Sequence, residues 1–177
     1  MGTRIMLVWL LAGLFVAPLP AIGKEARRMS ELQISSPAFS HHGTIPARFT
    51  CDGADVNPPL ALGSAPAGTR SLALIVDDPD APVGTWVHWV MWNIPPETRE
   101  IGENSVPPGA VQGLNDWKRN RYGGPCPPSG SHRYFFKLYA LDTTLTLAPS
   151  TTKAALERAM EGHILARGEL LGSYRRH

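Results

Sequence analysis

The segment Ser71–Asp78 (SLALIVDD) carries apolar side chains on both of the faces that a β-strand presents. Successive strand residues point to opposite sides of a sheet. The apolar residues therefore divide into two sets, with Leu72, Leu74 and Val76 on one face and Ala73 and Ile75 on the other. A strand with two apolar faces has to be covered on both, so this segment predicts a central strand in a layered protein.

Two further segments, Trp86–Ile94 and Ser131–Leu141, are rich in the aromatic and β-branched residues that favour strands. Gly168–Tyr174 predicts a weaker fourth strand, and Glu31–Ser35 and Ala47–Cys51 are candidate edge strands. The 17 prolines and 17 glycines favour short strands joined by shaped loops over a helical bundle.

One helix is predicted, over Lys153–Arg167. Ser150, Thr151 and Thr152 offer N-caps, apolar residues recur at helical spacing, and Gly168 supplies a C-terminal stop. The long loop from Pro95 to Pro128 is rich in proline and glycine, and loops of that length inside a compact domain usually carry function.

The N-terminus has the three parts of a secretory signal peptide. Arg4 precedes an apolar run from Ile5 to Val16, prolines follow, and Ala21-Ile22-Gly23 places small residues at a cleavage site. The run is shorter than the roughly 20 residues that a membrane span needs. We therefore expect a signal peptide over residues 1–23, a single domain over residues 24–177 without a transmembrane span, and a periplasmic or secreted location.

The charge balance argues against nucleic-acid binding. Removing residues 1–23 takes away one charge, that of Arg4, so the formal net charge falls from +2 to +1. A nucleic-acid binder normally shows a concentrated basic stripe. The small basic group of Lys118, Arg119 and Arg121 has the composition of ordinary solvated surface.

The two cysteines, Cys51 and Cys126, are candidates for a disulfide, because pairs of cysteines in exported proteins are usually bridged. A bridge over this separation would stabilise the fold by about 4 to 4.5 kcal/mol in the chain-entropy model. Two unrelated buried thiols are the alternative.

Several polar residues lie where predicted strands begin or end. His88 and His132 each lie near a strand start, and Asp78 ends the first strand. Strict alternation places two sets of side chains on shared faces: Trp86, His88, Val90 and Trp92 in one strand, and His132, Tyr134, Phe136 and Leu138 in another. Each polar residue alone also fits a structural role, such as a hydrogen-bonded core histidine or an Asp-Pro turn. Burying them together is costly unless they bond one another or a ligand, so their combination favours a site.

These segments also resemble a known family. DPDAP (residues 78–82), WVHW (86–89) and GSHRY (130–134) look like the two signature regions of the phosphatidylethanolamine-binding protein family. FTCDG (49–53), YGGPCPP (122–128) and AMEGHILARGELLGSY (159–174) resemble its bacterial, Raf-kinase-inhibitor-like branch.

The resemblance implies a mainly β fold of two antiparallel sheets with a C-terminal helix and a small pocket for phosphate-like anions at one end. The expected pocket residues are Asp78, Trp86, His88, Gly124, Pro125, His132 and Tyr134. Asp80 and Arg133 would support the loop architecture, and the Ala81–Pro82 bond is a candidate cis peptide.

The chain also departs from the family pattern. The loop Val83–Thr85 is short, whereas mammalian members carry a longer insertion with a further pocket tyrosine, and Val87 replaces a second histidine that many members have. The pocket mouth is therefore expected to have a different shape, which puts in doubt whether the headgroup specificity of the mammalian members carries over.

The expected function is that of an exported, non-catalytic protein without a cofactor or metal. It would bind phosphate-like anions or phosphorylated headgroups and act on a partner protein that the sequence does not identify. Anion affinity should rise as the pH falls through about 6 to 7, where histidines titrate.

Two alternatives remain open. One is an inhibitor of a peptidase or other enzyme that acts through its loops. The other is a hydrolase in which Asp78, His88 and His132 hold a metal. Against a hydrolase, the chain has no HExxH motif and no G-x-S-x-G elbow, and Ser131 should face away from His132.

Overall fold

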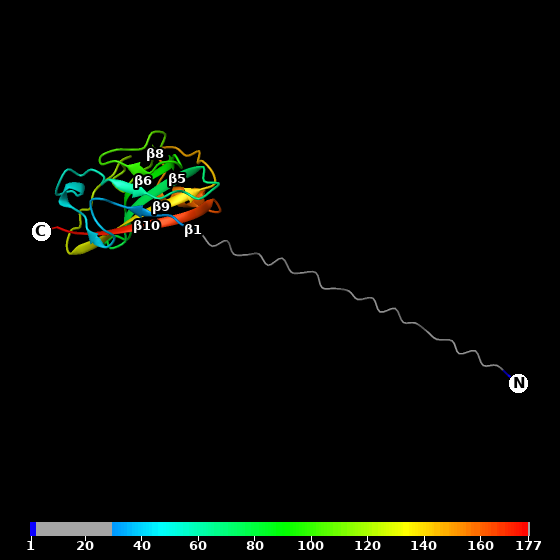
Figure 1. Ribbon diagram of the computed structural model, residues 1–177. Coiled ribbons are helices and arrows are strands. Elements are labelled where there is room, and N and C mark those ends of the chain that lie inside the picture. The colour runs from blue at the N-terminus through cyan, green and yellow to red at the C-terminus, as the bar shows by residue number, and fades with distance from the viewer. Residues whose placement is uncertain (3–29, 177) are drawn as a thin grey trace.

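The structure is a computed structural model that describes residues 1–2 and 30–176 (Figure 1). The expected signal peptide lies almost wholly outside the described residues, so the leader and its cleavage site stay predictions. Within the described part of the chain, no helix is long and apolar enough to cross a membrane.

The described chain forms two β-sheets, one large and one small. The large sheet has the strand order β1-β10-β9-β5-β6-β8, with β3 pairing with β10. Its strands are β1 (Ser30–Glu31), β3 (Gly43–Thr44), β5 (Ser71–Asp78), β6 (Trp86–Ile94), β8 (Val111–Gln112), β9 (Ser131–Leu141) and β10 (Ile164–Arg175). The small sheet has the order β2-β4-β7, with strands β2 (Ile34–Ser35), β4 (Leu60–Leu62) and β7 (Glu100–Ile101).

The predicted fold class is confirmed, with one refinement. The pairs β5·β6, β5·β9 and β9·β10 are antiparallel, as expected, and so are the pairs of the small sheet. The two-residue strands β1 and β3 instead run parallel to β10.

The two faces of β5 pack into two separate cores, as its alternation predicts. Leu72, Leu74 and Val76 lie in the core between the two sheets. Ala73 and Ile75 lie in a second core on the opposite face, where Leu156 and Met160 of the helix cover them. β5 is therefore a central strand, with β6 on one side and β9 on the other.

The helix prediction was too long. α1 runs over Lys153–Met160 and is followed by Gly162, which has a φ of 79°. A glycine in the left-handed region ends a helix readily. The rest of the predicted helix pairs with β9 as the beginning of β10, with Ala166 opposite Ala140. Long-range sheet pairing has overridden the local helical pattern there.

The edge-strand prediction for Ala47–Cys51 was also wrong. Ala47–Phe49 is a single 3₁₀ turn, η1, which buries Phe49 in the main core. The prediction for Glu31–Ser35 corresponds to two short strands, β1 and β2, which belong to different sheets.

β6 carries an extra residue at His88. Asp77 lies opposite Val87 and Val76 lies opposite Trp89, so two residues of β5 are matched by three of β6. Such a β-bulge breaks the alternation of side chains. Trp89 consequently packs in the core between the sheets, while Val90 and Trp92 pack under α1. The predicted shared face of Trp86, His88, Val90 and Trp92 is therefore wrong beyond His88.

The predicted disulfide is present. Cys51 and Cys126 are bonded, with their Cα atoms 5.4 Å apart. The bond joins the segment after η1 to the long loop that precedes β9, and both cysteines are exposed to solvent.

Candidate functional site

Sheet order brings the predicted polar residues to one end of the large sheet. β5 runs antiparallel to both β6 and β9, so its last residues meet the first residues of each neighbour. Asp78 ends β5, while His88 and His132 lie near the starts of β6 and β9. All three line one pocket of about 260 Å³. Its remaining lining residues are mostly apolar: Ala81, Pro82, Val83, Trp86, Trp117, Cys126, Pro127 and Pro128.

The Asp78 carboxylate is buried and engages both of its oxygens. Oδ2 lies 2.7 Å from His132 Nδ1, and Oδ1 accepts a hydrogen bond of 2.8 Å from the Asp80 backbone N–H. The bond to Oδ2 requires the proton of His132 to sit on Nδ1, which leaves Nε2 as the free ring nitrogen. Asp78 therefore orients His132.

His88 is held by a backbone contact rather than by a carboxylate. Its Nδ1 lies 2.6 Å from the Gly123 carbonyl oxygen, so Nδ1 donates the hydrogen bond. Burial lowers the pKa of His88, and the Gly123 bond and the Asp78 charge oppose that effect only in part. His88 is therefore neutral near pH 7, with an unprotonated Nε2.

Two buried donors of this region lack a hydrogen bond to any described residue: Tyr134 Oη and Trp86 Nε1. The Tyr134 ring meets the His88 ring edge to face, with centroids 5.2 Å apart. Burial, with the Asp78 charge, raises the pKa of Tyr134, so its hydroxyl stays protonated. Buried donors in native proteins are nearly always paired with protein or with water, so each of these two calls for a partner. Tyr134 contacts His88 but is not among the residues that line the pocket.

Asp80 and Arg133 tie the Asp-Pro turn to β9. Arg133 donates to Asp80 from its backbone N–H at 2.9 Å and from Nε and Nη2 of its guanidinium. The guanidinium bond lowers the pKa of Asp80 to about 2. Because the Asp80 N–H also holds Asp78, this pair fixes the carboxylate that orients His132.

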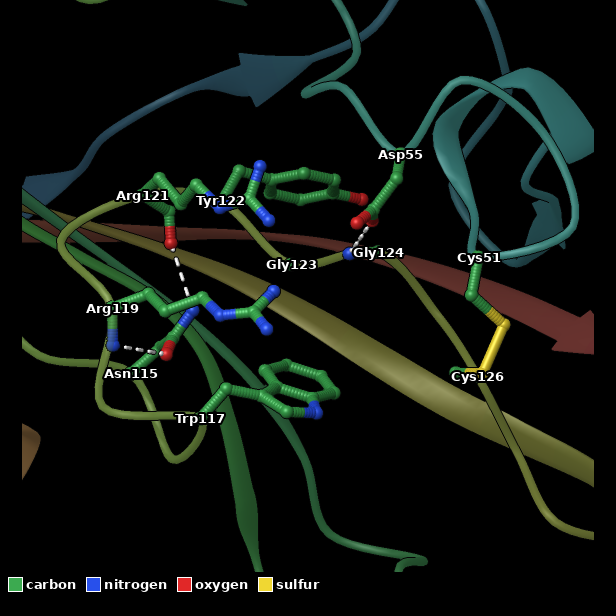
Figure 2. A pocket seen from close by; sticks show the side chains of 10 residues that line it. All are labelled: Cys51, Asp55, Asn115, Trp117, Arg119, Arg121, Tyr122, Gly123, Gly124 and Cys126. Carbon is green, nitrogen blue, oxygen red and sulfur yellow. Dashed lines mark hydrogen bonds between the residues drawn. A yellow bond between two sulfur atoms is a disulfide. The ribbon is translucent and has the colours of Figure 1, made fainter.

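Two residues expected in the pocket lie elsewhere. Gly124 and Pro125 do not line it, because their polar groups face the segment around Cys51. The Gly124 N–H donates to Asp55 Oδ1 at 2.6 Å (Figure 2), and the Pro125 oxygen accepts from the Cys51 N–H at 3.1 Å. The Gly124 N–H, the one backbone donor of the two residues, is therefore engaged, since proline has no N–H. The Ala81–Pro82 bond, a candidate cis peptide, is trans.

Trp117 is a lining residue that sequence reasoning missed. It lies in the long loop before β9, is 37% exposed, and meets the rings of Trp86 and His88 edge to face. The one signal for it in the sequence is a tryptophan inside a long loop, a place where a purely structural role is uncommon.

The described residues include no group of three or more His, Cys, Asp or Glu side chains placed to hold a metal ion. Ser131 is exposed while His132 is buried, so the hydroxyl and the imidazole lie on opposite faces of β9.

Comparison with known proteins places this geometry in context. A family model described as phosphatidylethanolamine-binding protein matches residues 35–175. A UPF0098 protein of Methanothermobacter thermautotrophicus is 51% identical over 150 residues, which cover 82% of this chain and 99% of the relative. A UPF0098 protein of Pyrococcus horikoshii is 48% identical over 174 residues, which cover 94% of this chain and 87% of the relative.

Two solved structures resemble the whole described fold. A Chlamydia trachomatis protein, described as a homologue of phosphatidylethanolamine-binding protein, gives a TM-score of 0.80 at 41% identity, covering 83% of this chain and 99% of that one. Escherichia coli YbcL is described as a new member of the mammalian phosphatidylethanolamine-binding protein family. It gives a TM-score of 0.78 at 30% identity, covering 84% of this chain and 100% of that one.

Proposed function

The chain belongs to the phosphatidylethanolamine-binding protein family, and on that premise we propose that it is an exported, non-catalytic protein that binds a phosphate-like anion or a phosphorylated headgroup. The observation that carries the proposal is the buried Asp78–His132 pair at the base of the pocket. A carboxylate bonded to Nδ1 fixes the tautomer and the direction of the imidazole, which leaves its other ring nitrogen, Nε2, for the ligand.

The donors near the pocket suit a tetrahedral oxyanion. Protonated His132 offers its Nε2–H, while Tyr134 Oη and Trp86 Nε1 are buried donors without a described partner. Neutral His88 offers a lone pair at Nε2, which accepts a hydrogen bond from a protonated phosphate oxygen. A monoprotonated phosphate group, which both donates and accepts, therefore complements this set better than a sulfate does.

The apolar wall of the pocket favours a ligand that also has an uncharged part. Pro82, Pro127 and Pro128 line it beside Val83 and Trp117. A phosphorylated headgroup carries carbon atoms next to its phosphate and would cover part of this surface. Phosphoethanolamine should therefore bind more tightly than inorganic phosphate.

Calorimetric titration between about pH 8 and pH 5 tests the proposal, because histidines titrate in that range. Affinity for inorganic phosphate should rise as the pH falls and His132 is protonated. The variant His132→Gln should lose this rise. His163→Gln is the matched control, since His163 forms a similar pair with Asp142 at 2.8 Å but is exposed. An affinity that is flat or falls toward low pH contradicts the proposal.

Export rests on the N-terminal leader and is supported by the disulfide, since disulfides persist in oxidising compartments. Protein recovered from outside the cytoplasm should begin at Lys24. An intact Met1 on a chain that stays in the cytoplasm would contradict export.

A second candidate function, inhibition of another enzyme through a loop, is favoured by one observation. Val83 is 79% exposed at the turn between β5 and β6, next to Gly84 with a φ of 96°. An apolar side chain displayed on a tight turn suits insertion into a partner. If this is the function, Val83→Ser should abolish capture of the partner while the affinity for inorganic phosphate, which has no carbon atoms to cover the apolar wall, stays unchanged. His132→Gln should do the reverse.

A further inference from the structure

A second cavity, of about 110 Å³, lies beside the pocket that contains His132 and shares Trp117 and Cys126 with it as common walls. Figure 2 shows this cavity, with Arg119 and Arg121 extending their side chains from one loop in the same direction. We call it the arginine cavity. Its residues come from two loops that the disulfide joins.

The two arginines lack a counter-charge. Neither guanidinium forms an ion pair or a hydrogen bond with any described residue. Some other arginines of the described chain are paired, as Arg133 is with Asp80 and Arg176 is with Asp52. Both residues are exposed, so solvent weakens the repulsion between their like charges.

The side chain of the buried Asn115 fixes the backbone of both arginines. Its Oδ1 accepts from the Arg119 N–H at 3.0 Å, and its Nδ2 donates to the Arg121 carbonyl at 2.9 Å (Figure 2). The Arg119 carbonyl in turn accepts from the Asn115 N–H. These bonds fix the backbone positions of both arginines. The guanidinium groups themselves remain free to bind a ligand.

Several other polar groups of the cavity are already engaged. Tyr122 Oη donates to the Phe49 carbonyl, the Gly123 N–H donates to the His88 carbonyl, and the Gly124 N–H donates to Asp55. Two guanidinium groups face one carboxylate, so the cavity has an excess of positive charge. The charged free donors are the guanidinium N–H groups of Arg119 and Arg121, which match the oxygens of an anion in pairs.

We propose that the arginine cavity is a subsite for a small oxyanion, distinct from the pocket around His132, in which Arg119 and Arg121 bind the oxygen atoms of a phosphate, sulfate or carboxylate group. The cavity has room for a few water molecules, and so for one such group. This subsite does not depend on the function proposed above, because none of its binding groups is Asp78, His88 or His132.

Nuclear magnetic resonance of the whole chain tests the subsite. Sodium sulfate is titrated at constant ionic strength and pH 7.5, with sodium acetate in a parallel titration. The Nε–Hε signals of Arg119 and Arg121 should shift and saturate. The same shifts should occur in His132→Gln, which disables the first pocket. A stronger response to sulfate identifies a tetrahedral group as the preferred ligand, and a stronger response to acetate identifies a carboxylate.

Three variants give matched arms. Arg119→Gln and Arg121→Gln should each weaken sulfate binding roughly tenfold, the order expected for one charge-assisted hydrogen bond at a partly exposed site. Arg175→Gln removes one charge from an exposed position on β10 outside the cavity and should change affinity less than about twofold. All three should unfold at the wild-type denaturant concentration.

Asp55→Asn should change the sulfate affinity in the opposite direction. Asp55 has a φ of 53°, which asparagine also tolerates, and an amide oxygen still accepts the Gly124 N–H. The variant removes the one negative charge of the cavity and should strengthen sulfate binding several-fold. Shifts that never saturate, shifts that vanish in His132→Gln, or an equal loss of affinity in Arg175→Gln would each overturn the proposal.

Discussion

Asp77 and Asp78 are adjacent in the sequence and both are buried, yet they have opposite surroundings. Asp77 points to the face that α1 covers, where Lys137 and Lys153 both contact its carboxylate. Asp78 points to the pocket and contacts His132. The difference lies in the partner: a lysine stays charged throughout the physiological range, whereas a histidine gains and loses its charge within it.

The comparison separates a structural carboxylate from a functional one. The cluster of Asp77, Lys137 and Lys153 joins β5, β9 and the first turn of α1, so its charges anchor the helix to the sheet. The Asp78–His132 pair joins the same two strands, β5 and β9, but lines a pocket instead of contacting the helix. Two carboxylates of one strand can thus be assigned different roles from the chemistry of their partners.

Asp77→Asn should have the largest effect on stability. It leaves two lysines beside a buried amide, and removing one partner of a buried ion pair typically costs about 3 to 5 kcal/mol. Both lysines are partly exposed and can turn toward water, so we expect about 2 to 3 kcal/mol. Urea unfolding measures the loss, while phosphate affinity should stay near the wild-type value. A loss below about 1 kcal/mol would break the comparison, because Asp77 would then not be a structural anchor.

Asp78→Asn should show the reverse. The amide still accepts the Asp80 N–H but no longer places a negative charge beside His132. Phosphate affinity at pH 6 should fall roughly tenfold, the order of one charge-assisted contact, and the rise in affinity toward low pH should flatten. The loss of stability should be smaller than in Asp77→Asn. Asp142→Asn, at the exposed pair with His163, is the control and should leave the affinity unchanged.

His88 predicts how stability depends on pH. Burial holds its folded pKa below the unfolded value, so the unfolded state takes up a proton first as the pH falls. This contribution to stability is complete above about pH 6.5 and is lost as the pH falls toward the folded pKa, with a slope of up to about 1.4 kcal/mol per pH unit. Urea unfolding at several pH values should show that slope in wild type and in His163→Gln. A wild-type curve that is flat below pH 6.5 would show that His88 is protonated in the folded state.

Arg133→Gln should have the smallest effect. Arg133 is largely exposed, so its pair with Asp80 should contribute less than about 1 kcal/mol. The folded pKa of Asp80 is about 2, below its ordinary value of 3.8, so the contribution is present above about pH 4 and is lost as the pH falls toward 2. Titration of the Asp80 carboxyl by nuclear magnetic resonance should show its pKa rising toward 3.8 in the variant. An unchanged pKa would show that Arg133 is not what lowers the pKa of Asp80.

The sequence predicts the parts of the site that lie on regular strands. Alternation in β9 correctly places His132 and Tyr134 on the buried face and Arg133 outside, because that strand has no bulge beside the pocket. In β6 the same rule fails after His88, because the bulge depends on pairing with β5 and leaves no local mark.

The loop residues were the least predictable. Gly124 has the residue type of an anion-binding turn, yet its N–H is engaged by Asp55, which lies 69 residues away in the sequence. Arg119 and Arg121 had the composition of solvated surface, and only the fold shows that they share a cavity. Contacts between distant loops decide both cases, and no periodicity encodes such contacts.

The bulge at His88 has a consequence for insertions and deletions. Trp86 faces the pocket, Val87 faces the core under α1, and Trp89 lies in the core between the sheets. Deleting His88 would place Val87 directly before Trp89, opposite the adjacent residues of β5, so regular alternation would keep Trp86 and Val87 on their present faces. The sheet should therefore accept a deletion of this one codon, and what the pocket would lose is the imidazole: the bulge adds a histidine to the pocket while the packing on both faces of β6 stays as a regular strand would have it.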